Sequence, residues 1–179
     1  MPTPGPYEPC PCGSGQKYKF CCVAKAKAIA ESSEKTIYTL DVFPTSERLF
    51  SKVRKKLRST IEILGSHTLQ DLHYLMYDLG GFDDDHLWEF LIGGKAFYDP
   101  ANRRYGPPEL GHRAAGVADR TTIGSLGLAE GDLFGYHFDF GDEWRFSLQV
   151  VTIELTDNRP PRPRITMRAK ESSRDADQK

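Results

Sequence analysis

The clearest periodic pattern in the chain is a helical one over residues 68–79. Thr68 is suited to cap the start of this helix, and Asp71, three residues later, completes a capping box. Gly80 and Gly81 follow, and glycine commonly ends helices. One face is apolar, formed by Leu69, Leu72, Leu75, Met76 and Leu79. The pattern therefore predicts a helix that packs one face on a sheet.

Shorter patterns predict strands and further helices around this one. Alternating β-branched and aromatic residues predict a strand over 36–43, a second over 58–64, and a third over 86–92 that stops at a Gly-Gly pair. Residues 131–155 alternate strongly on both sides of 139–142, which predicts a hairpin. Two stretches predict helices: 23–34 is rich in Ala, Lys and Glu, and 47–57 has apolar residues at helical spacing.

The remaining segments show no periodicity. Residues 99–120 are rich in Gly and Pro and predict a surface loop or insertion. We divide the chain into a disordered leader 1–8, a cysteine-containing knuckle 9–22, a linker helix 23–35, an α+β domain 36–157 and a disordered tail 158–179. Because helices and strands do not alternate regularly, we predict an α+β roll, with a mixed or antiparallel sheet packed by one main helix.

Composition narrows the functional classes. The 179 residues carry a formal net charge of −1, which argues against electrostatic coating of nucleic acid over the whole surface. The apolar stretches are too short to span a membrane, so we predict a protein without membrane segments. The first residues lack the apolar core of a signal peptide. We therefore expect a cytoplasmic protein.

All four cysteines lie between positions 10 and 22, at Cys10, Cys12, Cys21 and Cys22. Four thiolates close a tetrahedral zinc site, which is the geometry of structural zinc. Gly13 and Gly15 allow the backbone to fold back toward the sulfurs. The alternative is a pair of disulfides, but it needs an oxidising compartment, and adjacent Cys21 and Cys22 pair poorly with each other. We interpret the cluster as a Zn²⁺ site.

The run Cys-Pro-Cys-Gly-Ser-Gly, then Lys-Tyr-Lys, then Cys-Cys resembles the SEC-C motif over residues 9–22. This small zinc module occurs at the end of the bacterial preprotein-translocase ATPase, where it meets an export chaperone and the ribosome. The resemblance implies zinc and a role in protein interaction. We expect Lys17, Tyr18 and Lys19 to form the interaction surface.

Two polar clusters stand out in the rest of the chain. The first contains Asp83, Asp84, Asp85 and His86, with Glu89 nearby, and the second runs over 139–144, including Asp139, Asp142 and Trp144. Carboxylates near an imidazole suit metal binding or acid–base catalysis. They suit solvated turns better. With no nucleophile–base pair, we interpret both as structural turns and predict that they lie close together.

In order, Asp71-Leu72-His73, Asp83 to Leu87, and Asp139-Phe140-Gly141-Asp142 with Trp144 resemble the Ri-plasmid ORF-three-like family of insertion-element passenger proteins. The resemblance implies an α+β roll without an established biochemical function. This chain departs from the family at Phe82, where Trp is usual, and at Trp88 and Phe146, where His is usual. The tryptophan usual near Leu57 is also missing.

We interpret the chain as a zinc-binding, non-enzymatic interaction protein whose partner is a protein that binds the knuckle. Two alternatives stay open. One is an enzyme that uses Asp85, His86 and Asp142. The other is a DNA-associated protein of a mobile element, which would use the basic run over 52–58 to contact phosphates.

Overall fold

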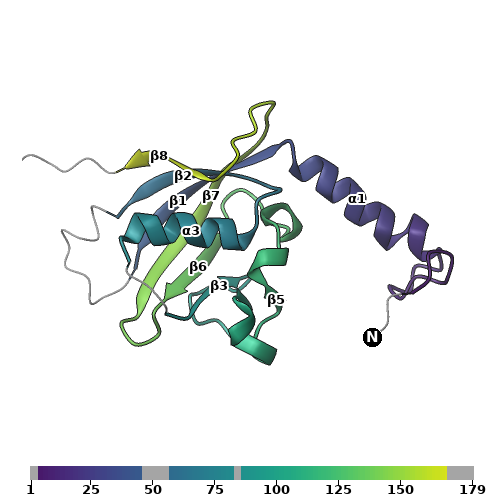
Figure 1. Ribbon diagram of the computed structural model, residues 1–179, viewed down its shortest axis with the longest axis horizontal. Coiled ribbons are helices and arrows are strands. Elements are labelled where there is room, and N and C mark those ends of the chain that lie inside the picture. Colours follow the sequence, from purple (N-terminus) through teal and green to yellow (C-terminus); the bar gives the residue numbers. More distant parts are fainter. Residues whose placement is uncertain (1–3, 46–56, 83–85, 169–179) are drawn as a thin grey trace, which may run out of the picture.

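The computed structural model describes residues 4–45, 57–82 and 86–168. It has an α+β body and an N-terminal module that extends away from it on a helix (Figure 1). The predicted α+β class is thereby confirmed. Most of the helix predicted over 47–57, the basic run at 52–56, and Asp83, Asp84 and Asp85 lie outside the described residues.

The described residues of the body form one eight-stranded sheet in the order β5-β4-β3-β6-β7-β1-β2-β8. All neighbouring strands are antiparallel except β4 and β5. The strands are β1 (Thr36–Pro44), β2 (Ser59–Leu64), β3 (Trp88–Ile92), β4 (Arg103–Gly106), β5 (Gly116–Val117), β6 (Leu133–Phe138), β7 (Trp144–Leu155) and β8 (Arg164–Arg168). β6 and β7 form the predicted hairpin.

Helix α3 (Leu69–Gly80) lies across one face of the sheet (Figure 1). Thr68 and Asp71 form the predicted capping box, and Gly81 ends the helix in the left-handed conformation with φ of 62°. The apolar face buries Leu69, Leu72, Met76 and Leu79 against strand residues such as Leu40, Ile61, Phe90, Tyr136 and Phe146. This interface is the core of the body, and burial of its apolar surface stabilises the fold.

Helix α1 (Cys22–Ser33) connects the module to the body. Residues 23–32 are all exposed, whereas Ser33 is buried. Glycines at 65 and 124 let Ser33 approach closely, because a Cβ at Gly124 would lie 2.1 Å from the Ser33 hydroxyl. Figure 1 shows that α1 contacts the body at this end and carries the cysteine-containing segment at the other.

The structure corrects three sequence predictions. Residues 99–120, predicted as a loop, contain β4, β5 and the short helical turns η2 (Pro108–Arg113) and η3 (Ala118–Arg120). Residues 164–168, placed in a disordered tail, form β8, which pairs with β2 and is held by an Arg164–Glu62 ion pair. Residues 6 and 8 of the predicted disordered leader accept backbone hydrogen bonds from Lys19 and Tyr18. Short strands such as these depend on neighbours distant in sequence, so local periodicity does not reveal them.

Candidate functional site

The first candidate site is the cysteine cluster at the far end of α1. Residues 9–17 fold back on themselves, with a bridge between Pro9 and Lys17 and a hydrogen bond from the Cys10 N–H to the Gln16 carbonyl. Gly13 and Gly15 take positive φ values of 78° and 73° in this turn. This loop positions Cys10 and Cys12 opposite Cys21 and Cys22, which begin α1.

The four sulfur atoms converge. All four Sγ atoms lie within 4.8 Å of one another, with Cys10 Sγ 3.2 Å from Cys22 Sγ and Cys12 Sγ 3.5 Å from Cys21 Sγ. Cys10 and Cys21 are buried, Cys22 is partly buried and Cys12 is exposed. Within the described ranges, this is the one group of three or more Cys, His, Asp or Glu residues placed to hold a metal ion.

The local environment favours thiolate character at the first cysteine pair. Hydrogen bonding by Ser14 lowers the pKa of Cys12 to about 6, and the backbone N–H of Cys12 lowers the pKa of Cys10. Their sulfurs in turn raise the pKa of Cys22 to about 12. A cation at the centre of the cluster relieves this crowding of negative charge, because metal coordination favours the deprotonated thiol.

Exposed aromatic and basic side chains lie beside the cysteines. Tyr7 and Phe20 are 59% and 62% exposed, with ring centroids 6.4 Å apart. The ammonium groups of Lys17 and Lys19 lie 5.7 Å and 5.4 Å from the Tyr7 ring centroid. Tyr18, which we predicted on the interaction surface, is only partly exposed. We call Tyr7, Lys17, Lys19 and Phe20 the knuckle surface.

The described residues of the two polar clusters named from the sequence, His86 and residues 139–144, lie in the body. His86 Nε2 is 3.6 Å from Asp139 Oδ2, and the Asp139 N–H donates to the Leu87 carbonyl. Asp139 Oδ1 accepts hydrogen bonds from the N–H groups of Gly141 and Asp142, so this carboxylate holds the hairpin turn. Asp142 is exposed. Trp144 packs against Phe82 with centroids 5.0 Å apart.

A further polar cluster lies on the sheet face opposite α3. The pairing of three strands brings its residues together. Glu89 on β3 pairs with His137 on β6, which pairs with Arg145 on β7. Because strand residues alternate between faces, this row faces away from α3, whereas the preceding and following residues face α3. Glu89 and His137 are only 3% and 4% exposed.

The groups in this row contact one another and two further side chains. His137 Nδ1 lies 3.6 Å from Glu89 Oε1, and His137 Nε2 lies 3.7 Å from Glu143 Oε2. Arg104 Nε donates to Glu89 Oε2 at 2.5 Å, and Arg145 pairs with Glu143. Burial raises the pKa of Glu89, but the contacts with His137 and Arg104 outweigh burial and hold the pKa below its usual range. Glu89 is therefore ionised at neutral pH.

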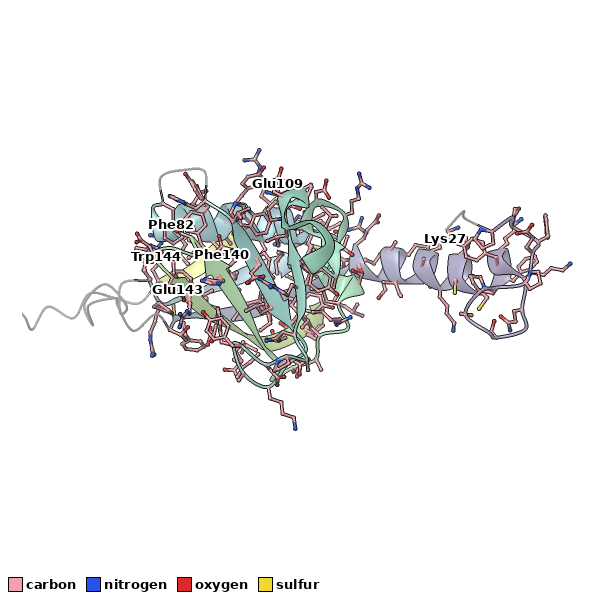
Figure 2. All side chains as sticks on the ribbon, turned by 90° about the horizontal axis from the view of Figure 1, so that it is seen from below. Lys27, Phe82, Glu109, Phe140, Glu143 and Trp144 are labelled. Atoms are coloured by element: carbon pink, nitrogen blue, oxygen red, sulfur yellow. The ribbon has the colours of Figure 1, made fainter. Side chains whose placement is uncertain are left out.

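A cavity of about 360 Å³ opens beside these residues. Its lining includes Glu89, His137, Arg104, Phe97 and Phe140. Figure 2 shows Phe140, Glu143 and Trp144 at one end of the body, with Lys27 on α1 beyond the other end. The hairpin end of the cavity is thus remote from the cysteine cluster.

The face covered by α3 holds Trp88 and Phe146, the two positions at which the resemblance led us to expect histidine. His73 stacks on Trp88 with centroids 3.8 Å apart and shares a 2.9 Å hydrogen bond with the Tyr136 hydroxyl. Burial lowers the pKa of His73 to about 4, so its imidazole is neutral at pH 7. Phe146 is fully buried near Tyr136, with centroids 6.1 Å apart. At these positions, the chain has an aromatic core.

Sequence reasoning named Glu89 but missed His137 and Arg104. A charged residue between Trp88 and Phe90 is the signal that marks Glu89, since an acid inside a strand rich in aromatic residues needs a buried partner. His137 has the same kind of setting, between Tyr136 and Phe138. Arg104 lies in the segment predicted as a loop, so no pattern placed it beside β3.

Comparisons with known proteins agree with this division into a module and a body. A family profile described as plasmid pRiA4b ORF-3-like protein matches residues 50–176, and the SEC-C motif matches residues 8–22. The chain therefore belongs to the plasmid pRiA4b ORF-3-like family. No curated protein matches the chain.

Among solved structures, the chain is similar to a protein of unknown function from Methanosarcina mazei Go1. The two are 18% identical, with a TM-score of 0.57, and the match covers 76% of this chain and 71% of that one. This likeness shows the fold alone. The described residues also contain no helix long and apolar enough to cross a membrane.

Proposed function

We propose that this chain is a zinc-binding interaction protein, in which the knuckle on α1 binds a protein partner and the body starts at β1. The observation that supports it is the convergence of four Sγ atoms within 4.8 Å beside an exposed aromatic and basic surface. β1 lies between β2 and β7, which supports its inclusion in the body although the family match begins at residue 50.

The sulfur positions fit zinc. At a Zn–S distance of about 2.3 Å, the sulfurs of a tetrahedral site lie about 3.8 Å apart, so a cluster within 4.8 Å needs little rearrangement. Four thiolates fill the coordination sphere and leave no position for a substrate. Four thiolates around Zn²⁺ carry a net negative charge, which Lys17 and Lys19 offset. A cytoplasmic location, which we also propose, keeps the thiols reduced.

The knuckle surface suits an acidic peptide segment with an apolar side chain. Tyr7 and Phe20 together offer two large rings at about 60% exposure, and such rings commonly anchor protein interfaces. Lys17 and Lys19 lie beside the rings and would pair with carboxylates. Because α1 is exposed along residues 23–32, a partner can approach the knuckle without contacting the body.

The test uses two pairs of matched substitutions in the full chain. Lys17→Gln with Lys19→Gln changes the knuckle surface, whereas Lys25→Gln with Lys27→Gln makes the same charge change on exposed positions of α1. Each purified, reduced protein is first assayed for zinc, and we expect one ion per chain. Binding partners are then captured and identified for all three proteins.

We expect a partner that binds the wild type and the α1 variant but not the knuckle variant. A third variant, Phe20→Ala, should weaken capture of the same partner. Absence of zinc in the freshly purified wild type would refute the metal site. An identical set of captured proteins for all variants would refute the knuckle surface as the binding surface.

A further inference from the structure

The cavity opposite α3 is a candidate ligand site that the proposed knuckle function does not use. Its volume of about 360 Å³ falls within the range of small-molecule sites. Two of the carboxylates that line it form ion pairs: Glu89 pairs with Arg104, and Glu143 pairs with Arg145. In each pair, the guanidinium group offsets the charge of the carboxylate.

Further hydrogen bonds engage the lining carboxylates. Asp99 accepts hydrogen bonds of 2.8 Å and 2.9 Å from the N–H groups of Lys95 and Ala101. Glu143 accepts a 2.9 Å hydrogen bond from the Tyr98 hydroxyl. A charged ligand would therefore lose its hydration in the cavity without meeting an unpaired opposite charge. The lining thus favours a neutral ligand over a cation or an anion.

His137 offers hydrogen-bonding capacity that the protein itself does not use. The residue is 4% exposed, and neither ring nitrogen has a hydrogen-bond partner in the described part of the chain. Its Nδ1 lies 3.6 Å from Glu89 Oε1, beyond a normal hydrogen bond. One oxygen atom placed beside this gap can lie about 2.8 Å from both atoms, which is a normal hydrogen-bonding distance.

A hydroxyl is a neutral group that suits the gap between Glu89 and His137. Where Nδ1 carries a proton, the hydroxyl oxygen accepts it and the hydroxyl donates its own proton to the carboxylate. Where Nδ1 carries none, the hydroxyl donates to Nδ1 or to the carboxylate. The hydroxyl therefore has a partner in either form of the imidazole.

Aromatic side chains surround these polar groups. The ring centroids of Phe97, Tyr98 and Phe140 lie 5.8 Å, 6.3 Å and 4.7 Å from that of His137. Leu91 adds an aliphatic side chain to the lining. A flat apolar ring is stabilised by contact with such walls, whereas a water molecule is not.

We propose that this cavity binds a small neutral alcohol that carries an aromatic ring. The hydroxyl lies between Glu89 Oε1 and His137 Nδ1, and the ring packs against Phe97 and Phe140.

Four probes that share one ring test the proposal on the full chain. Benzyl alcohol is neutral and carries a hydroxyl, toluene lacks the hydroxyl, benzylamine is cationic and benzoate is anionic. Binding is followed by titration with NMR detection of backbone amides. We expect saturable shifts at residues 89, 137 and 140 with benzyl alcohol. Toluene should bind at least about threefold more weakly because it makes no hydrogen bond. Benzylamine and benzoate should bind at least about tenfold more weakly because each brings an unpaired charge.

Matched variants locate the site. His137→Phe removes Nδ1 but keeps a ring, so it should reduce the preference for benzyl alcohol over toluene while toluene still binds. Phe140→Leu should weaken binding of both probes, and it provides a second variant should His137→Phe fail to fold. Tyr74→Leu makes the same kind of change at an exposed position of α3 and should affect neither probe.

Equal binding of benzyl alcohol and toluene would overturn the proposal, and so would an ionic probe that binds as tightly as benzyl alcohol. An unchanged preference for benzyl alcohol in His137→Phe, or failure of all four probes to bind, would overturn it as well. None of these results bears on the zinc knuckle, which is tested by zinc content and partner capture.

Discussion

The N-terminal module and the body differ in how much apolar surface each one buries. In the part of the module that the structure describes, the buried hydrophobic residues are Cys10 and Cys21, and the helix that follows is exposed over 23–32. In the body, α3 and the sheet bury a continuous core that includes Leu40, Ile61 and Phe146. A segment as small as the module cannot fold on apolar burial alone, so metal coordination is the available source of stability.

Helix α1 shows how the two regions join. A helix of its length is marginal in water, and the Lys27–Glu31 ion pair on its surface is exposed and stabilises it little. Its ends are fixed instead: Cys22 begins the helix inside the cysteine cluster, and Ser33 is buried against the body. We therefore expect metal binding to determine whether the first turns of α1 are folded. The contact with the body should determine this for the last turn.

The largest effect should follow from removing a buried aromatic side chain from the core of the body. Phe146 is fully buried among Tyr136, Phe82 and neighbouring core residues, so Phe146→Ala should lower the free energy of unfolding of the body by about 4 kcal/mol. Chemical denaturation monitored by tryptophan fluorescence measures this, because Trp88 and Trp144 both lie in the body.

Zinc content of the same variant provides the control. If metal rather than the core stabilises the module, the Phe146→Ala variant should retain its zinc at the low denaturant concentrations that already unfold its body. Loss of zinc in parallel with unfolding of the body would show that the two regions fold as one unit.

A smaller effect should appear on acidification. The pKa of His73 is about 4 in the folded protein, because burial disfavours the charged imidazole, against 6.5 when exposed. The unfolded chain therefore binds a proton more readily as pH falls. This contribution to stability is complete above about pH 6.5 and is lost between 6.5 and 4, to a limit of about 3 kcal/mol.

The variant His73→Gln isolates this contribution, because glutamine can bond the Tyr136 hydroxyl but does not titrate in this range. Unfolding free energies of both proteins are compared from pH 7 to pH 4. Stability should fall more steeply for the wild type. Parallel curves for the two proteins would mean that His73 is not buried in its neutral form.

Sequence patterns predicted those parts of the molecule whose determinants are local. The capping box of α3, the β6–β7 hairpin and the grouping of four cysteines all depend on residues close together in the chain. The polar cluster at Glu89 depends instead on register, since His137 and Arg104 come from two other strands. Register is not visible before the strands are paired, and β4 was too short to be recognised.

The most direct test of the account is hydrogen exchange, measured residue by residue, before and after zinc is removed with a chelator. Removal should abolish protection over 10–22 and in the first turns of α1, while amides of β1, β6 and β7 keep theirs, because the core is independent of the metal. The account would be contradicted if the knuckle amides stayed protected without metal. It would also be contradicted if the strands lost protection together with the knuckle.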